Sequence, residues 1–146
     1  MTKNSLDMLK EMADVDLEID KSSLDYESLR TPKLHNKWLR MMFDRKERLK
    51  NLELKKKILT RDTWLYYNGK ASEEVYKRRG PFHLKVMKTD LNMFIEADEE
   101  ANKMDAQIER AKGELEFVQK TLDEINRRSF HISNALKALK FLNGEA

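Results

Sequence analysis

The most regular pattern of hydrophobic and polar positions lies in the last third of the chain. Its apolar residues follow one another at spacings that alternate between three and four, and the frame resumes after Ser129: Phe94, Ala97, Ala101, Met104, Ile108, Ala111, Leu115, Val118, Leu122, Ile125, Ile132, Leu136 and Leu139. Such spacing keeps one side of a helix apolar, as in coiled coils. It predicts a long helical section with one apolar seam, which stops at Asn143-Gly144. The pattern leaves open a bend at residues 127–129, where Ser129 can act as a cap.

A second amphipathic pattern predicts another long helix in the middle of the chain. Thr31-Pro32 combines an N-cap hydroxyl with a proline at the first helical position, so it marks the start. At about 100° per residue, two stripes separate along this helix. The apolar stripe predicts a core face: Leu34, Trp38, Met41, Met42, Leu49, Leu52 and Leu59. The other stripe is basic and ends in an aromatic residue: Lys46, Lys50, Lys57, Arg61 and Trp64.

Turn signals separate the two helical sections. Asn68-Gly69 predicts the end of the middle helix, and Gly80-Pro81 marks a second break. Residues 68–84 are therefore expected to form a connector, in which Ser72 before two glutamates predicts the start of one short helix. Residues 1–30 are acidic with scattered apolar positions, and we expect at most short helices there.

Composition supports an all-α fold made of a long helical hairpin. The 146 residues include only four glycines and two prolines, too few for many short strands and tight turns, and the chain length is that of one domain. The chain has no cysteine, which excludes disulfides and thiol chemistry and suits a reducing compartment. The longest stretch without Asp, Glu, Lys or Arg is residues 129–136, far shorter than a membrane span. We therefore expect a cytoplasmic protein with no membrane partner.

Charge divides the chain into three segments. Residues 1–32 carry four basic and eight acidic side chains, a net charge of −4. Residues 33–88 carry seventeen basic and six acidic ones, a net charge of +11, and residues 89–146 carry eight and twelve, again −4. We interpret these segments as an acidic N-terminal segment, a DNA-binding basic helix with its connector, and a C-terminal helical assembly region. A basic middle between acidic ends is typical of proteins that bind a polyanion, although the ends can also neutralise the middle within the fold.

A hairpin of two long helices has one internal seam and leaves much apolar surface uncovered. Self-association through helix packing is the favoured interpretation of this uncovered surface. The alternative is a monomer of three or four helices in which residues 1–30 fold back over the hairpin. The residues expected in the assembly contact are Phe94, Met104, Ile108, Leu115, Val118, Leu122, Ile125, Ile132, Leu136 and Leu139.

No catalytic or metal-binding arrangement is recognisable in the sequence. His35, His83 and His131 are far apart, and none is spaced from another ligand as in a known metal motif. The acidic run at residues 96–100 lacks the alternating ligands of a calcium loop. Phosphate-binding loops and nucleophile elbows are absent. We therefore expect no enzymatic activity, no cofactor and no metal.

The basic segment predicts a site for single-stranded nucleic acid. Cations can bind phosphates while aromatic rings stack on bases, and the two kinds of side chain are mixed here. Each aromatic residue on its own is more typical of a core anchor, and it is their clustering that favours the site. The candidate contacts are Lys50, Lys55, Lys56, Lys57, Arg61, Trp64, Tyr67, Lys70, Lys77, Arg78 and Arg79.

Several stretches of the chain resemble the UvsY family of T-even-type bacteriophages. The matching words are KWL at 37–39, LKKKIL at 54–59, YYNGKA at 66–71, EVYKRRGPF at 74–82, KTDLNMFIEAD at 88–98 and RSFHISNALKALKFLNG at 128–144. The segment IDKSSLDYE, which begins at Ile19, is also similar to the family's N-terminal signature. The resemblance therefore extends over most of the chain.

The resemblance implies a recombination mediator without catalytic activity, located in the cytoplasm of the infected bacterial host. Family members are homo-oligomeric rings of six or seven protomers that bind single-stranded DNA. They promote loading of the phage recombinase onto strands covered by the phage single-strand-binding protein. The family's basic DNA-binding element is matched by Arg61, whereas Thr63 replaces a second basic residue of the pattern. The alternative is a coiled-coil scaffold or adaptor with no DNA-specific role.

Overall fold

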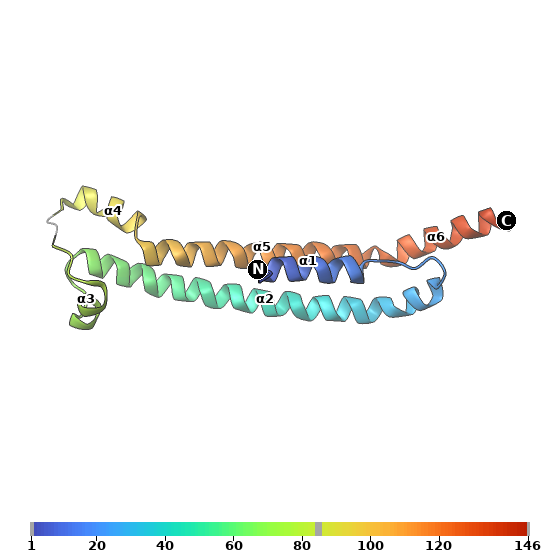
Figure 1. Cartoon of the computed structure of the whole chain (residues 1–146), viewed down its shortest axis with the longest axis horizontal. Helices are drawn as coiled ribbons and strands as arrows, with labels where there is room; N and C mark the ends of the chain where they lie inside the picture. Colours follow the sequence, from blue (N-terminus) through green and yellow to red (C-terminus); the bar gives the residue numbers. More distant parts are fainter. Residues whose placement is uncertain (1, 84–85, 146) are drawn as a thin grey trace. The chain divides into compact units, whose positions relative to one another are not determined.

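The structure, a computed structural model, describes residues 2–83 and 86–145, and these form helices and short connections with no strand among them. The helices are α1 (Ser5–Asp16), α2 (Leu24–Tyr67), α3 (Glu73–Arg79), α4 (Lys88–Glu96), α5 (Glu99–Asn126) and α6 (Arg128–Leu142) (Figure 1). The predicted all-α fold is confirmed. The chain divides into two compact units: unit 1 is Met1–Lys46 with Lys112–Ala146, and unit 2 is Glu47–Ala111. These units do not coincide with the three charge segments because α2 and α5 each contribute to both units.

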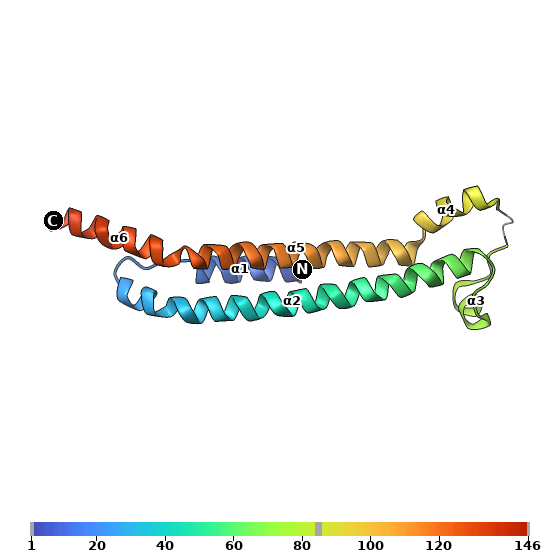
Figure 2. The same ribbon diagram turned by 180° about the vertical axis from the view of Figure 1, so that it is seen from behind.

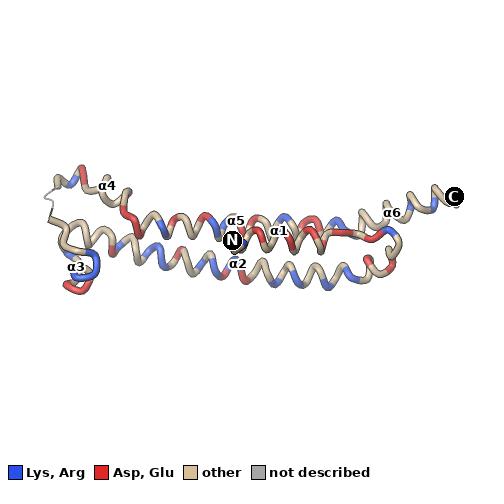
Figure 3. The backbone as a smooth tube through the Cα atoms, in the orientation of Figure 1, with Lys and Arg blue, Asp and Glu red and all other residues tan. Residues whose placement is uncertain are grey.

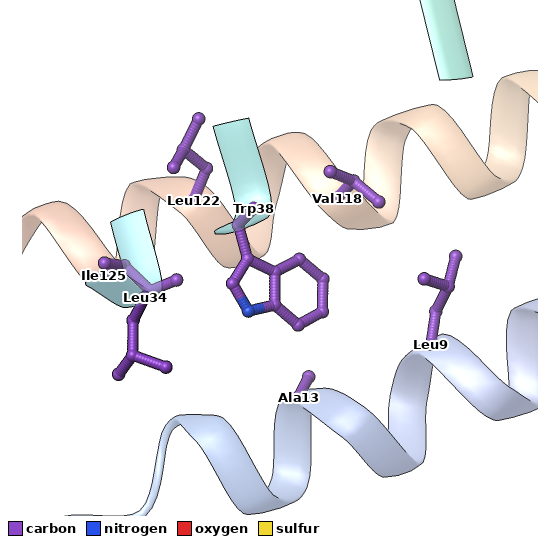
Figure 4. Packing of buried hydrophobic residues seen from close by; sticks show 7 residues of the cluster. All are labelled: Leu9, Ala13, Leu34, Trp38, Val118, Leu122 and Ile125. Atoms are coloured by element: carbon purple, nitrogen blue, oxygen red, sulfur yellow. The ribbon is translucent and has the colours of Figure 1, made fainter. Parts of the chain in front are cut away.

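Unit 1 is built around Trp38. Its indole is fully buried between Val118, Leu122 and Ile125 of α5 and the α1 residues Leu9 and Ala13 (Figure 4). The indole Nε1 donates a hydrogen bond of 3.0 Å to Asp16 at the end of α1. In both Figure 1 and Figure 2, α1 lies against the first part of α2 and the last part of α5. The N-terminal segment thus folds back over the helix pair, as the monomeric alternative required.

The predicted start of α2 at Thr31-Pro32 is wrong. The helix begins at Leu24, and Pro32 lies inside it. A proline in a helix leaves the carbonyl one turn earlier without its partner, which disfavours the turn. Here that turn is supported by contacts from elsewhere: Thr31 Oγ1 donates to the carbonyl of Glu27 and accepts from the Arg128 guanidinium, each at 3.1 Å.

The bend left open at residues 127–129 is a short break at Arg127, between α5 and α6. Ser129 is already in the first turn of α6 and does not cap it. Arg128 is buried, with 2% of its surface exposed, and its guanidinium pairs with the buried carboxylate of Glu27 at 2.6 Å. It also donates to the carbonyl oxygens of Asp16 and Glu18. Arg128 therefore joins the α1–α2 connection, α2 and α6.

Unit 2 pairs the last turns of α2 with the first turns of α5. Lys56 forms an ion pair with Asp105 at 2.7 Å, and Tyr67 donates a hydrogen bond to Asp98 at 2.8 Å, so the two segments are antiparallel. α2 ends at Tyr67, as the Asn68-Gly69 signal predicted, and Gly69 has a φ of 73°. The short helix predicted after Ser72 is α3.

The apolar seam is interrupted where the sequence pattern is continuous. α4 ends at Glu96 and α5 begins at Glu99, with Asp98 accepting a hydrogen bond from the backbone N–H of Ala101. An aspartate that caps the first turn of a helix favours a new start over an uninterrupted helix. The break moves Phe94 onto a separate short helix, while Met104, Ile108 and the later residues of α5 stay on one.

Most seam residues are covered by the chain itself. Ile108, Val118, Leu122, Ile125 and Ile132 are buried, and Phe94, Met104, Leu115 and Leu139 are half-buried. Leu136 is exposed. Helices of the same chain therefore cover the α5 part of the seam, and Leu136, the exposed member of the seam, lies on α6.

Candidate nucleic-acid interface

The predicted core face and basic face of α2 are both present. All seven residues of the apolar stripe are buried or half-buried, whereas Lys46, Lys50, Lys57, Arg61 and Trp64 are exposed. We use the name basic face for the last four, which lie in unit 2. At about 100° per residue they fall within about 60° around the helix axis. In Figure 3 the blue positions of Lys and Arg recur along this part of α2.

The cations of the basic face are available to an external anion. Lys50 and Lys57 are exposed, and neither has an acidic partner among residues 2–83 and 86–145. Arg61 bonds to the neighbouring Asp62 at 3.0 and 3.1 Å, in a pair whose side chains are both largely exposed. Water screens such an exposed pair strongly, so it opposes a phosphate contact only weakly.

Apolar side chains adjoin these cations, which the sequence reasoning did not identify. Leu54 and Ile58 are exposed large hydrophobics, and Trp64 is 47% exposed. Leu54 and Ile58 were detectable in the sequence, because at about 100° per residue they fall beside the basic stripe, about 20° and 60° beyond Arg61, rather than on the core stripe. The result is a surface of alternating cationic and apolar groups, which suits the phosphates and the faces of bases in a single strand.

The other two lysines of the LKKKIL stretch differ in their surroundings. Lys55 is exposed but lies well away from the basic face around the helix. Lys56 is half-buried and is paired with Asp105 of α5. Lys56 therefore forms a contact inside unit 2, whereas Lys55 is exposed on another side of α2.

Trp64, the last residue of the basic face, lies beside Lys70. The ammonium of Lys70 is 5.2 Å from the centroid of the indole ring. Such a cation–π contact keeps the ring and the charge side by side. Lys77, on α3, is exposed and has no partner among the described residues.

Arg79 and Tyr67 belong to an internal network instead. Asp98 is 1% exposed and accepts hydrogen bonds from the Arg79 guanidinium, from the Tyr67 hydroxyl and from the N–H of Ala101. Burial opposes the charge of Asp98, but the hydrogen bonds from Arg79, Ala101 and Tyr67 hold the pKa of Asp98 below its ordinary value. Burial, together with the bond to Asp98, raises the pKa of Tyr67 to about 12.

Aromatic rings complete this network. The Arg79 guanidinium lies 4.2 Å from the ring centroid of Tyr66, and Tyr66 stacks on Tyr76. Phe82 and Phe94 contact the ring of Tyr67. Arg78 is exposed and pairs with Glu100. Arg79 and Tyr67 therefore hold α2, α3 and α5 together through Asp98. The sequence favours a solvated face for the acidic run at residues 96–100, and for Asp98 that interpretation is wrong because its carboxylate is buried.

Thr63, which replaces a basic residue of the family pattern, is fully buried. Its hydroxyl has no hydrogen-bond partner within the described part of the chain. A cation with its head in this position would lose its hydration, which is unfavourable. In this chain the basic face therefore does not include position 63.

Neither a cluster of metal ligands nor a membrane-spanning helix is found among the described residues. They contain no group of three or more His, Cys, Asp and Glu side chains that could hold a metal ion. No described helix combines the length and the apolar composition that a membrane crossing needs.

Known proteins are similar to this chain over most of its length. Residues 12–145 match the family described as "Recombination, repair and ssDNA binding protein UvsY". The recombination protein uvsY of Enterobacteria phage T4 is 26% identical over 129 residues, which are 88% of this chain and 90% of that protein.

Solved structures agree with the sequence comparison. A crystal structure of the bacteriophage T4 recombination mediator protein UvsY, in lattice type I, has a TM-score of 0.78 at 25% identity and covers 91% of this chain and 97% of that one. The structure in lattice type II has a TM-score of 0.80 at 25% identity and covers 97% of this chain and 99% of the other. This chain is thus similar to the T4 protein both in sequence and in fold.

Proposed function

Because the chain belongs to the UvsY family of recombination, repair and single-stranded-DNA-binding proteins, we propose that it is a recombination mediator that holds single-stranded DNA on the basic face of α2. The observation that carries the proposal is the pair of exposed lysines, Lys50 and Lys57, which have no acidic partner among the described residues and lie in line with Arg61 and Trp64. Eleven residues separate Lys50 from Arg61, which corresponds to about 16 Å along a helix. That length suits contact with several phosphates of one strand.

The contacts fall into two groups. Lys50, Lys57 and Arg61 bind phosphates, and Lys70 and Lys77 extend the cationic surface beyond the end of α2. Trp64, half exposed beside Lys70, stacks on a base. Arg79 and Tyr67 act indirectly, since they hold the helices that carry these residues.

Self-association multiplies the contacts. A single basic face binds weakly, but several copies joined in a ring of six or seven protomers raise the effective concentration of the next site along the strand. The assembly uses the exposed apolar residues of α6. A strand held in this way is less available to a phage single-strand-binding protein and is presented to a phage recombinase, which is the mediator activity.

Replacement of two cations tests the proposal. The variant Lys57→Ala with Arg61→Ala should bind fluorescent single-stranded oligonucleotides more weakly than the unchanged chain, with the same mass in light scattering. The slope of log K against log salt is negative, and each lost phosphate contact should reduce its magnitude by about 0.7. Titrations across a salt series measure both quantities.

The control variant is Lys10→Ala with Lys21→Ala. Both lysines are exposed, lie outside the basic face and have no partner among the described residues. This variant should keep nearly the full affinity and slope. Equal losses in both variants would show that net charge alone matters, and no loss in the first would place the strand elsewhere. No binding of single strands by the unchanged chain would favour the scaffold alternative.

A further inference from the structure

A hollow of about 300 Å³ opens in unit 2 between the last turns of α2 and α3. Its apolar lining comes from Leu65, Ala71 and Val75, and its polar lining from Asp62, Lys70 and Ser72. Pockets that hold small organic molecules have volumes from about 300 to 1,000 Å³ and combine apolar walls with a few polar groups. The hollow has this character at the smallest size in that range.

Two cations of the DNA-binding surface adjoin the hollow. Lys70 lines it, and the same ammonium lies over the ring of Trp64. Arg61 of the basic face donates two hydrogen bonds to Oδ1 of Asp62, a lining residue. A phosphate chain that follows the basic face to Lys70 therefore passes along the edge of the hollow.

The polar groups of the lining have capacity to spare. Ser72 precedes α3, but its hydroxyl makes no capping hydrogen bond. The hydroxyl also has no other partner among the described residues. The hydrogen bonds of Asp62 within the same residues all go to Oδ1, which leaves Oδ2 to accept another. Together they offer a hydroxyl and an acceptor to a planar group with N–H and C=O edges.

We propose that this hollow is a subsite for one base of the bound single strand. The proposal rests on the proposed function, because it takes the strand to lie on the basic face. The apolar walls cover the faces of the base, while Asp62 and Ser72 bond to its edge. All four DNA bases carry N–H donors and acceptors, so the subsite accepts any of them. Lys70, which lines the hollow, and Arg61, which is bonded to Asp62 of the lining, favour a polyanion over an apolar peptide as the occupant.

Abasic DNA tests the subsite apart from the backbone contacts. The unchanged chain is titrated with an oligothymidylate and with an oligonucleotide of equal length made of abasic sugar phosphates. Loss of stacking on a protein side chain costs about 1–3 kcal/mol per base, which is about 5- to 150-fold in affinity. Because one base stacks on Trp64 and a second enters the hollow, we expect the oligothymidylate to bind more tightly by at least about 25-fold, the product of the two lower limits, with equal salt slopes for the two ligands.

The variant Val75→Trp fills the hollow without changing a charge. It should reduce the ratio of the two affinities at least about fivefold and leave the salt slope unaltered. Part of the ratio should remain because Trp64 still stacks. The matched control makes the same substitution at Val15, which is 66% exposed on α1 in unit 1, and it should keep the full ratio.

The outcomes separate the two proposals. Equal affinity of the unchanged chain for both oligonucleotides would overturn the subsite and the stacking on Trp64, and it would leave the phosphate contacts of the basic face standing. Failure to bind either of them would overturn both. If Val75→Trp lowers the helical content in circular dichroism, Ala71→Leu replaces it as a smaller filling substitution. An unchanged ratio in a well-folded filling variant would overturn the subsite.

Discussion

At the scale of single residues, Asp98 explains why some side chains of the basic segment are bonded internally while others are exposed. Arg79 and Tyr67 resemble DNA contacts in the sequence because they lie among Lys70, Lys77 and Trp64. Their polar atoms are bonded to one buried carboxylate. A buried charge is tolerated when it is paired and hydrogen-bonded. The same side chains are therefore part of the interior of unit 2, and only their neighbours face outward.

The Tyr67 hydroxyl gives this network a measurable signature. Because burial and the bond to Asp98 favour the protonated phenol, the pKa of Tyr67 rises from 10.0 to about 12. A raised pKa in the folded state contributes stability that is fully present below pH 10 and is lost as the pH rises through about 12. In an alkaline titration followed by near-ultraviolet absorbance, we expect a late tyrosine step that Tyr67→Phe removes.

Tyr26→Phe is the control for this titration, since Tyr26 is 60% exposed on α2. The late step should remain in that variant. A titration in which Tyr67→Phe keeps the late step would contradict the assignment.

At the scale of helices, the junction of α5 and α6 depends on one buried ion pair. Arg128 and Glu27 lie 101 positions apart, yet their charged groups are 2.6 Å apart, and both residues are buried. Removing one partner of a buried pair leaves the other charge without compensation, whereas replacing both removes the unfavourable burial as well. The pair therefore holds the start of α6 against the first turns of α2.

Methionine substitutions measure this effect. Arg128→Met should lower the free energy of unfolding in urea by about 3–5 kcal/mol. Adding Glu27→Met should recover part of the loss, because the isolated carboxylate disappears. Arg127→Met is the matched control: Arg127 pairs with Glu124 at the surface, and its loss should change stability by about 0.5 kcal/mol or less. Additive losses in the double variant would argue against coupling of the pair.

At the scale of the whole molecule, the proposed self-association depends on which apolar surface the chain leaves uncovered. On α6, Phe130 is 65% exposed and Phe141 is 82% exposed. Eleven residues separate them, which places them within about 20° on one side of the helix. Val118 and Leu122, by contrast, are buried in unit 1. The two phenylalanine rings offer apolar contacts to a partner on one side of α6, with Asn134 and Lys137 between them.

Two charged variants distinguish the roles of these residues. Phe130→Asp with Phe141→Asp should lower the mass in light scattering while the helical content and the unfolding midpoint stay close to those of the unchanged chain. Leu122→Asp should instead lower the unfolding midpoint, because a charge would be placed in the core. An unchanged mass in the first variant would move the assembly surface away from this side of α6.

The residue pattern by itself determined what depends on local spacing. The all-α class, the core and basic stripes of α2, the end of α2 at Tyr67 and the short helix after Ser72 all follow from helical periodicity and turn chemistry. The family resemblance likewise followed from short stretches of the chain, and the comparisons confirm it.

Only the tertiary structure decided what depends on residues far apart in sequence. The start of α2 before Pro32 relies on Arg128, and the break before Glu99 coincides with the bonds from Tyr67 and Arg79 to Asp98. Coverage of the α5 seam comes from α1. In the first two cases, buried contacts between residues far apart in sequence stabilise a local conformation that the local pattern disfavours or leaves open. Periodicity reports which side of a helix is apolar, and the tertiary contacts decide which partner covers it.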